Sequence, residues 1–251
     1  MIGVSGGMGP LATADFLNKV IEETHATADE DHVPLLISCD PRIPPRPAAI
    51  LAGGESPLPR LIEIRDRLLA AGATVLVMPC NTAHYWYDDL TADCPVPFLS
   101  IVEAGCLEAL RLAGAGASIG VASTRATLTA GLFDRLLERY GLTPVTPTEN
   151  ELEHSILPAI AAVKAGELQE AARLAIESLD GMANRGANHI LLACTELPVA
   201  AAAATRWTSA ICIDTTRVLA RTTVDHWALE SRHPSTAGAC RDSRHAITSG
   251  R

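Results

Sequence analysis

The sequence predicts an α/β protein with two similar domains, each a mostly parallel sheet flanked by helices. Short apolar segments alternate with longer segments whose apolar residues recur at helical spacing, the pattern typical of βαβ units. Two parts of the chain also resemble each other. The composition agrees with this fold class: 48% of residues are hydrophobic but only 4% are aromatic, so small aliphatic side chains must fill the core.

The expected elements follow one another along the chain. Apolar segments bounded by turn residues predict strands at residues 1–5, 33–38, 74–78, 117–122, 189–193 and 211–214. Segments with one apolar face predict helices at residues 11–24, 58–71, 125–140, 151–163, 166–185 and 215–229. Pro10 suits the first turn of the first helix, and a proline-rich loop is expected at residues 39–57.

The self-similarity predicts duplicated halves. Residues 72–80 and 186–194 both lead from Gly-Ala through an apolar strand to a cysteine, at an offset of 114 residues. Residues 2–5 and 119–122 match at an offset of 117 residues. Loops gather at the carboxyl ends of parallel strands, and ligands bind there. Halves related by a pseudo-twofold axis would therefore place the two cysteines on opposite sides of one cleft.

These patterns predict a domain organisation. The first domain is expected to combine residues 1–100 with residues 211–229, and the second to span residues 101–210. The active site is expected in the cleft between them. Residues 230–251 are polar and irregular, so a disordered tail is expected there.

Charge and cysteine usage exclude several classes of protein. The net charge of −9 argues against nucleic-acid binding, and no apolar run reaches the roughly 18 residues that a membrane helix needs. Seven cysteines at irregular spacing, with no CxxC pair, predict neither a disulfide framework nor structural zinc. No basic and apolar leader begins the chain. We therefore expect a cytoplasmic protein with reduced thiols and no metal.

Two opposed thiols have a specific chemical use. Racemisation removes a proton from one face of a carbon and returns a proton to the other face, and two acid–base groups can do this in place. A thiolate accepts a proton and a thiol donates one, so Cys80 and Cys194 are the candidate catalytic residues. Polar residues follow each cysteine, and the backbone N–H groups there could bind a carboxylate. The other five cysteines are interpreted as small apolar residues.

Other motifs admit a second interpretation. Gly7, Gly9 and Ala12 after a strand, with Asp40 ending the next strand, also fit a weak dinucleotide-binding fingerprint. Pro10 argues against it, because proline lacks the N–H that a pyrophosphate would need.

Two titratable residues close to the cysteines keep alternative roles. His84, four residues after Cys80, is either a general base or a residue that supports the site from behind. Glu196, two residues after Cys194, either polarises the region around that thiol or caps its helix.

Three motifs together resemble the aspartate/glutamate racemase superfamily, and the match is closest to aspartate racemases. They are GGMGP at residues 6–10, MPCNTAH at residues 78–84 and ACTELP at residues 193–198, within a resemblance that covers most of residues 1–229. The resemblance implies two similar α/β domains, no pyridoxal phosphate, no metal and a homodimer. It also implies that Cys80 and Cys194 are the two catalytic thiols.

The resemblance further assigns residues to the substrate. It implies roles in binding the α-carboxylate or amino group, or in lining the site, for Met8, Asn81, Thr82, Thr124 and Thr195. Arg46 and Lys164 match cations of the family that would contact a side-chain carboxylate, and arginine and lysine suit a dicarboxylate physically.

The chain departs from the family pattern close to Arg46. Pro45 stands where aspartate racemases commonly have an aspartate, and Ala48 and Ala49 stand in a segment that often carries a larger polar or aromatic residue. Both departures weaken the case for strict aspartate specificity.

The predicted function is therefore a cofactor-independent racemase of aspartate or a related acidic amino acid. Glutamate or broad-specificity racemases share the fold, as do maleate isomerases, hydantoin racemases and decarboxylases. Some of these use a single cysteine, so the presence of two favours racemisation. A pyridoxal enzyme would need a Schiff-base lysine, and the sequence contains only Lys19 and Lys164. A non-catalytic binding module with an intact cleft remains the alternative outside the enzymes.

Overall fold

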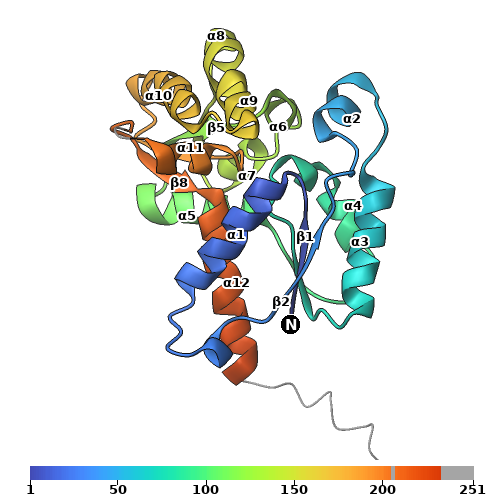
Figure 1. Ribbon diagram of the computed structural model, residues 1–251. Helices are drawn as coiled ribbons and strands as arrows, with labels where there is room; N and C mark the ends of the chain where they lie inside the picture. The colour runs from blue at the N-terminus through green and yellow to red at the C-terminus, as the bar shows by residue number, and fades with distance from the viewer. Residues whose placement is uncertain (205–206, 233–251) are drawn as a thin grey trace, which may run out of the picture.

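The computed structural model describes residues 1–204 and 207–232, and it contains two four-stranded parallel sheets (Figure 1). The first sheet has the order β2-β1-β3-β4, formed by Leu35–Cys39, Ile2–Gly6, Val75–Val77 and Phe98–Leu99. The second has the order β6-β5-β7-β8, formed by Thr143–Val145, Ser118–Ala122, His189–Leu192 and Ile211–Asp214. The predicted fold class is confirmed.

The two sheets have the same topology. In each, the first strand of the half pairs on one side with the second strand and on the other side with the third. The central strands β1 and β3 are fully buried, as are β5 and β7 apart from their first residues. The strands that end near Cys80 and Cys194, β3 and β7, therefore occupy equivalent positions in their sheets.

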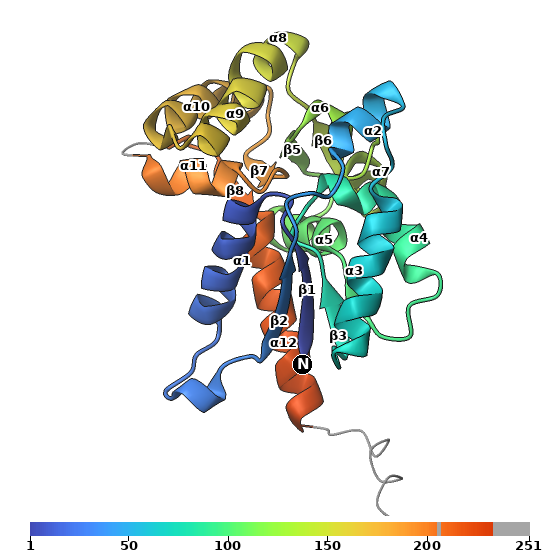
Figure 2. The same cartoon turned by 45° about the vertical axis from the view of Figure 1, so that its right-hand side comes forward.

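Helices cover the faces of both sheets (Figures 1 and 2). Those of the first half are α1 (Pro10–Glu23), α2 (Arg46–Ala52), α3 (Leu58–Ala70) and α4 (Tyr87–Thr91), with short 3-10 turns η1 (Asp29–Asp31) and η2 (Thr82–Trp86). Those of the remainder are α5 (Ile101–Ala113), α6 (Arg125–Thr129), α7 (Asp134–Arg139), α8 (Glu149–Glu151), α9 (Leu157–Ala165), α10 (Leu168–Asn184), α11 (Leu197–Ala203) and α12 (Thr215–Arg232), with a π-helical turn η3 (Leu152–Ile156).

Several elements differ from the sequence prediction, which contained no helix at Ile101–Ala113 or Leu197–Ala203 and no strand at Phe98–Leu99 or Thr143–Val145. Two further differences have a local cause. The helix expected at residues 125–140 is two helices, α6 and α7, because Gly131 between them has φ +59° and cannot continue a right-handed helix. The proline-rich loop at residues 39–57 contains a helix, α2, whose N-terminal turn accepts Pro47.

The structure corrects the position of the last strand. Residues 211–214 were expected in the first domain, but β8 pairs in parallel with β7 of the second sheet. The helix that follows, α12, packs against both α1 and α5, and so contacts both halves (Figures 1 and 2). The sequence identified a strand, but it contained no signal for which neighbouring strand would pair with it.

Buried contacts join the two halves. One apolar core includes Val4 and Val77 of the first sheet together with Val121 and Leu191 of the second. Near it, Lys19 of α1 lies 2.7 Å from Asp214 of β8 and 2.5 Å from Asp15.

The sequence predicted that a disordered tail begins at residue 230. In the structure, α12 continues to Arg232. Residues 233–251 lie outside the described residues. In the described part of the chain, no helix is both long enough and apolar enough to cross a membrane.

Candidate active site

One small cavity between the halves brings the predicted site residues together. It is lined by Met8, Arg46, Pro47, Cys80, Asn81, Thr82, Thr124, Lys164, Cys194, Thr195 and Glu196. Its volume is about 50 Å³. Every residue that the sequence placed at the site lines this cavity except His84.

Cys80 and Cys194 reach the cavity by equivalent routes. Cys80 follows β3 and Cys194 follows β7, and each lies just before a helical turn, η2 or α11. Their exposed fractions are 5% and 6%, so the two thiols are equally enclosed. Burial raises the pKa of Cys80, and the guanidinium of Arg46 opposes that increase. Burial also raises the pKa of Cys194, and the carboxylate of Glu196 adds to the increase.

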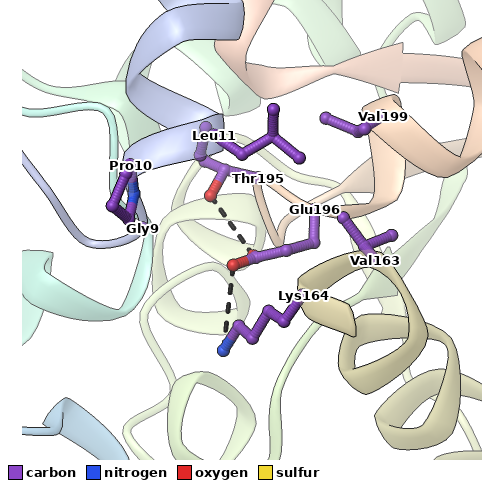
Figure 3. A pocket seen from close by; sticks show the side chains of 9 residues that line it. Gly9, Pro10, Leu11, Val163, Lys164, Thr195, Glu196 and Val199 are labelled. Carbon is purple, nitrogen blue, oxygen red and sulfur yellow. Dashed lines mark hydrogen bonds and ion pairs between the residues drawn. The ribbon is translucent and has the colours of Figure 1, made fainter. Parts of the chain in front are cut away.

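Glu196 connects Cys194 to a cation. The Cys194 thiol donates to Glu196 Oε2 at 3.1 Å, and the Thr195 hydroxyl lies 3.4 Å from the same oxygen. The other oxygen, Oε1, lies 3.8 Å from Lys164 Nζ (Figure 3). The Glu196 side chain is 10% exposed and the Lys164 side chain 65% exposed. Glu196 is therefore in direct contact with the thiol, whereas Lys164 reaches the site from the solvent side.

Asn81 presents an oxygen that has no partner. Thr215 donates its hydroxyl hydrogen to the carbonyl of Leu192 at 2.9 Å, so its oxygen accepts from Asn81 Nδ2 at 3.2 Å. This fixes the orientation of the Asn81 amide. Asn81 Oδ1 is buried and has no hydrogen-bond partner among the described residues. Because buried polar atoms in proteins are nearly always paired, this acceptor is available to a bound ligand.

Three hydroxyl groups meet where the halves join. The Thr82 hydroxyl of the first half lies 2.8 Å from that of Thr127 and 3.3 Å from that of Thr124 in the second half. The hydroxyl groups of Thr124 and Thr127 are 3.0 Å apart, and the Thr124 hydroxyl also accepts from the Thr127 backbone at 3.3 Å as the N-cap of α6. Sequence reasoning missed Thr127, which lies behind the cavity and orients the two hydroxyl groups that line it.

Arg46 is held at the edge of the cavity by backbone groups. Its Nη1 donates to the carbonyls of Ile43 and Pro44 at 3.1 and 3.0 Å. Neither contact uses a carboxylate, so the positive charge is not neutralised by these contacts. Sequence reasoning also missed the neighbouring Pro47, which lines the same cavity.

His84 supports the site from behind rather than lining it. Its Nε2 accepts from the Ile101 backbone at 3.2 Å, so the ring proton lies on Nδ1, which donates to the Cys80 carbonyl at 2.9 Å. Burial lowers the pKa of His84 to about 4, so the ring is neutral at pH 7. Both ring nitrogens are occupied, and the geometry therefore favours the supporting role over that of a general base.

The dinucleotide interpretation does not fit the geometry. Asp40 forms ion pairs with Arg42 and Arg60, which hold the pKa of its carboxyl well below the usual range. The carboxylate is therefore engaged rather than free for a ribose hydroxyl. Gly7 has φ +97°, and a Cβ there would meet the Asp40 backbone at 2.4 Å. Close packing of the two loops explains this glycine without a ligand.

A larger pocket, of about 340 Å³, adjoins the cavity that Cys80 and Cys194 line (Figure 3). The two share Lys164, Thr195 and Glu196. The other walls of the pocket come from Gly9, Pro10, Leu11, Ala12, Val163 and Val199. Neither the cavity nor the larger pocket contains a metal-binding group. Across residues 1–204 and 207–232, no group of three or more His, Cys, Asp or Glu side chains could hold a metal ion.

Comparisons with known proteins agree with this geometry. The broad specificity amino-acid racemase RacX of Bacillus subtilis (strain 168) is 28% identical over 203 residues, which cover 78% of this chain and 86% of that protein. The aspartate racemase of Picrophilus torridus superposes with a TM-score of 0.80 at 29% identity, covering 90% of this chain and 94% of the other. An aspartate racemase homologue from Pyrococcus horikoshii OT3 superposes with a TM-score of 0.73 at 25% identity, covering 90% and 98%.

A family model gives the broadest match. The model of the Asp/Glu/hydantoin racemases matches residues 6–223, which include both cysteines and every strand except most of β1. The resemblance that the sequence motifs indicated is therefore confirmed, and this chain belongs to the Asp/Glu/hydantoin racemase family and is a racemase.

Proposed function

We propose that this protein interconverts L- and D-aspartate, or a related acidic amino acid, by proton transfer between Cys80 and Cys194 without a cofactor. The observation that carries the proposal is that two buried thiols, at the ends of equivalent strands, line one small cavity. One thiol removes the α-proton from one face of the substrate, and the other returns a proton to the opposite face. Inversion then requires no movement of the substrate.

The polar groups of the cavity suggest how the substrate is held. Asn81 Oδ1, the buried acceptor without a partner, is suited to the substrate ammonium group. The hydroxyl groups of Thr82, Thr124 and Thr195 can donate to the α-carboxylate. These contacts would place the α-carbon between the two thiols.

A second carboxylate needs its own cation. Arg46 and Lys164 line the cavity from the first and second halves respectively. An arginine can bind a carboxylate through two hydrogen bonds, and a lysine attracts it as a point charge. We therefore assign these two residues to the side-chain carboxylate of the substrate.

The absence of pyridoxal chemistry is also part of the proposal. The chain has two lysines: Lys19 is buried between Asp15 and Asp214, and Lys164, 3.8 Å from Glu196, is assigned above to the substrate carboxylate as a charged group. Neither is placed as a free amine for a Schiff base.

A second candidate is a racemase of broad specificity. The similarity to RacX supports it, as does the replacement of an aspartate and of larger residues by Pro45, Ala48 and Ala49 beside Arg46. A loop with small side chains constrains the substrate side chain less. Glutamate would also fit the pattern of two cations.

The test is incubation of the purified protein with L-aspartate, L-glutamate and L-alanine, followed by circular dichroism of the amino acid. Loss of optical activity for aspartate with little for alanine is the expected result. Comparable rates for all three would favour the broad-specificity candidate. No loss for any of them would contradict racemisation of these amino acids.

We also propose that the protein acts in the cytoplasm as a homodimer. Reduced thiols support the location, since the six cysteines in the described part of the chain are all unpaired. The homodimer rests on the family resemblance alone. Light scattering coupled to size-exclusion chromatography measures the mass directly, and a monomer would contradict this part of the proposal.

A further inference from the structure

The larger pocket beside the cavity has no role in the proposed mechanism. Its volume is about 340 Å³, against about 50 Å³ for the cavity that the two cysteines line. Small-molecule sites in proteins have volumes of about 300 to 1,000 Å³ and mostly apolar walls. The pocket is therefore large enough to hold part of a substrate.

The walls of the pocket are mostly apolar. They come from the first turn of α1, the end of α9 and the start of α11. Leu11, Val163 and Val199 contribute branched aliphatic side chains (Figure 3). Among the described residues that line the pocket, only Lys164 and Glu196 are charged, and both also line the cavity. Beyond these shared residues, the pocket offers apolar side chains and no charged group.

The pocket lies where a long substrate side chain would extend. In the proposed function, Lys164 binds the carboxylate at the end of an acidic side chain. Lys164 also lines the pocket. With the α-carbon between the two thiols, a side chain that reaches Lys164 has crossed the cavity to its boundary with the pocket. A longer side chain in the same direction would continue past Lys164 into the pocket.

The boundary between the cavity and the pocket can open without a large loss of stability. Lys164 Nζ lies 3.8 Å from Glu196 Oε1, and the Lys164 side chain is 65% exposed. An exposed ion pair contributes little to stability, and the stem of a lysine is flexible. A lysine can also keep its ammonium group in water while its methylene groups cover apolar atoms. Lys164 can therefore move aside for an apolar side chain and remain solvated.

An apolar ligand is the kind that this pocket would stabilise. Leu11 is 51% exposed and Val199 is only partly buried, so a ligand in the pocket would remove apolar surface from water. Burial of apolar surface is favourable in proportion to its area. A charged group placed among the same side chains would lose its hydration without gaining a partner.

We propose that the pocket binds the side chain of a second class of substrate, amino acids with a long, uncharged aliphatic side chain. The inference rests on the proposed two-thiol racemisation and adds a substrate class to it. The α-carbon, ammonium and α-carboxylate of such a substrate occupy the same places as those of aspartate, and the same two thiols remove and return the α-proton. Only the side chain differs, because it passes Lys164 and lies against Leu11 and Val199.

Three amino acids test the chemistry of the pocket. L-Norleucine has a long unbranched aliphatic side chain, L-alanine has a side chain too short to reach the pocket, and L-lysine adds an ammonium group to the side chain of norleucine. Circular dichroism gives kcat/KM for each. Each methylene group in a hydrophobic pocket changes kcat/KM by about tenfold or more, so norleucine should exceed alanine at least tenfold. Norleucine no better than alanine would overturn the proposal, and so would lysine better than norleucine.

Substitutions in the walls isolate the pocket. Leu11→Ser removes an apolar side chain at an exposed position of α1, so kcat/KM for norleucine should fall about tenfold relative to that for aspartate. Val199→Phe fills the pocket from α11 and should lower the same ratio. Leu107→Ser is the matched control, because this exposed leucine of α5 lines neither the cavity nor the pocket. An unchanged ratio in both wall variants would overturn the proposal.

The outcomes separate this inference from the proposed function. If Val199→Phe does not fold, it loses activity toward every substrate, and the ratio in Leu11→Ser decides. If aspartate is racemised but norleucine is not, the role of the pocket is wrong and the proposed function stands. If norleucine is racemised but aspartate is not, the assignment of an acidic substrate fails and the role of the pocket stands. If no amino acid is racemised, both fail.

Discussion

Cys80 and Cys194 follow equivalent strands of two sheets with the same topology, and both line one cavity. Under the proposed mechanism, each thiol acts on its own face of the substrate, because the strands approach the cavity from different halves. The expected consequence is that neither cysteine can replace the other.

Cys80→Ala and Cys194→Ala should each abolish racemisation, since inversion needs an acid on the face opposite to the base. Circular dichroism of aspartate measures the rate. Cys39→Ala is the matched control, because that cysteine is exposed at the end of β2, and it should retain full activity. Near-normal racemisation by either cavity variant would contradict the two-base mechanism.

Arg46→Ala and Lys164→Ala should reduce kcat/KM for aspartate far more than for alanine. Loss of one charged hydrogen bond to the substrate costs about 2 to 4 kcal/mol, or roughly a hundredfold in kcat/KM. Arg173→Ala is a suitable control, because Arg173 pairs with Glu170 away from the cavity. If the ratio of the two efficiencies is unchanged in both cavity variants, the assignment of an acidic substrate is wrong.

Activity should survive exhaustive dialysis against a metal chelator, with neither pyridoxal nor nicotinamide added. Thiol alkylation should inactivate the enzyme, since the proposed mechanism uses thiolates and these react with alkylating agents. The measurement is the rate of aspartate racemisation before and after each treatment. Loss of activity on chelation that added metal restores would point to a different reaction chemistry.

The buried His84 predicts a dependence of stability on pH. Burial lowers its pKa from 6.5 to about 4, so between these pH values the unfolded chain binds a proton that the folded protein does not. The free energy of unfolding should therefore rise with pH in this window, by roughly 1 kcal/mol per pH unit from this residue, and be lost as the pH falls.

Urea unfolding between pH 4 and 7.5 measures this contribution as a difference between variants. His84→Gln can still accept from the Ile101 backbone and donate to the Cys80 carbonyl, but it does not titrate, so its profile should be flatter. His25→Gln, at an exposed position, should keep the slope of the unmodified protein. Parallel profiles for the His84 variant and the unmodified protein would show that His84 contributes no such dependence.

Much of the fold and the composition of the cavity could be predicted from the sequence because the signals are local. The strands before Cys80 and Cys194 are short apolar segments, and parallel strands deliver the residues that follow them to one edge of a sheet. The three sequence motifs contained seven of the eleven residues that line the cavity, and Arg46, Pro47, Thr124 and Lys164 lie outside them.

Contacts between distant segments could not be predicted in the same way. The hydrogen bond from Asn81 to Thr215 spans 134 residues, and the contact between Thr82 and Thr127 depends on how η2 packs against α6. The pairing of β8 with β7 likewise depends on tertiary packing and not on the composition of the strand. No periodicity within a single segment encodes such relationships.

The most direct test of the two-base mechanism is the origin of the α-hydrogen in newly formed product. L-Aspartate is incubated with the protein in deuterium oxide, and the two enantiomers are separated early and analysed by mass spectrometry. If two thiols act from opposite faces, the D-aspartate formed carries deuterium from the exchanged thiol, while the remaining L-aspartate still carries protium. D-Aspartate that retains the original α-hydrogen would show that one group carries the proton across, and would contradict the mechanism.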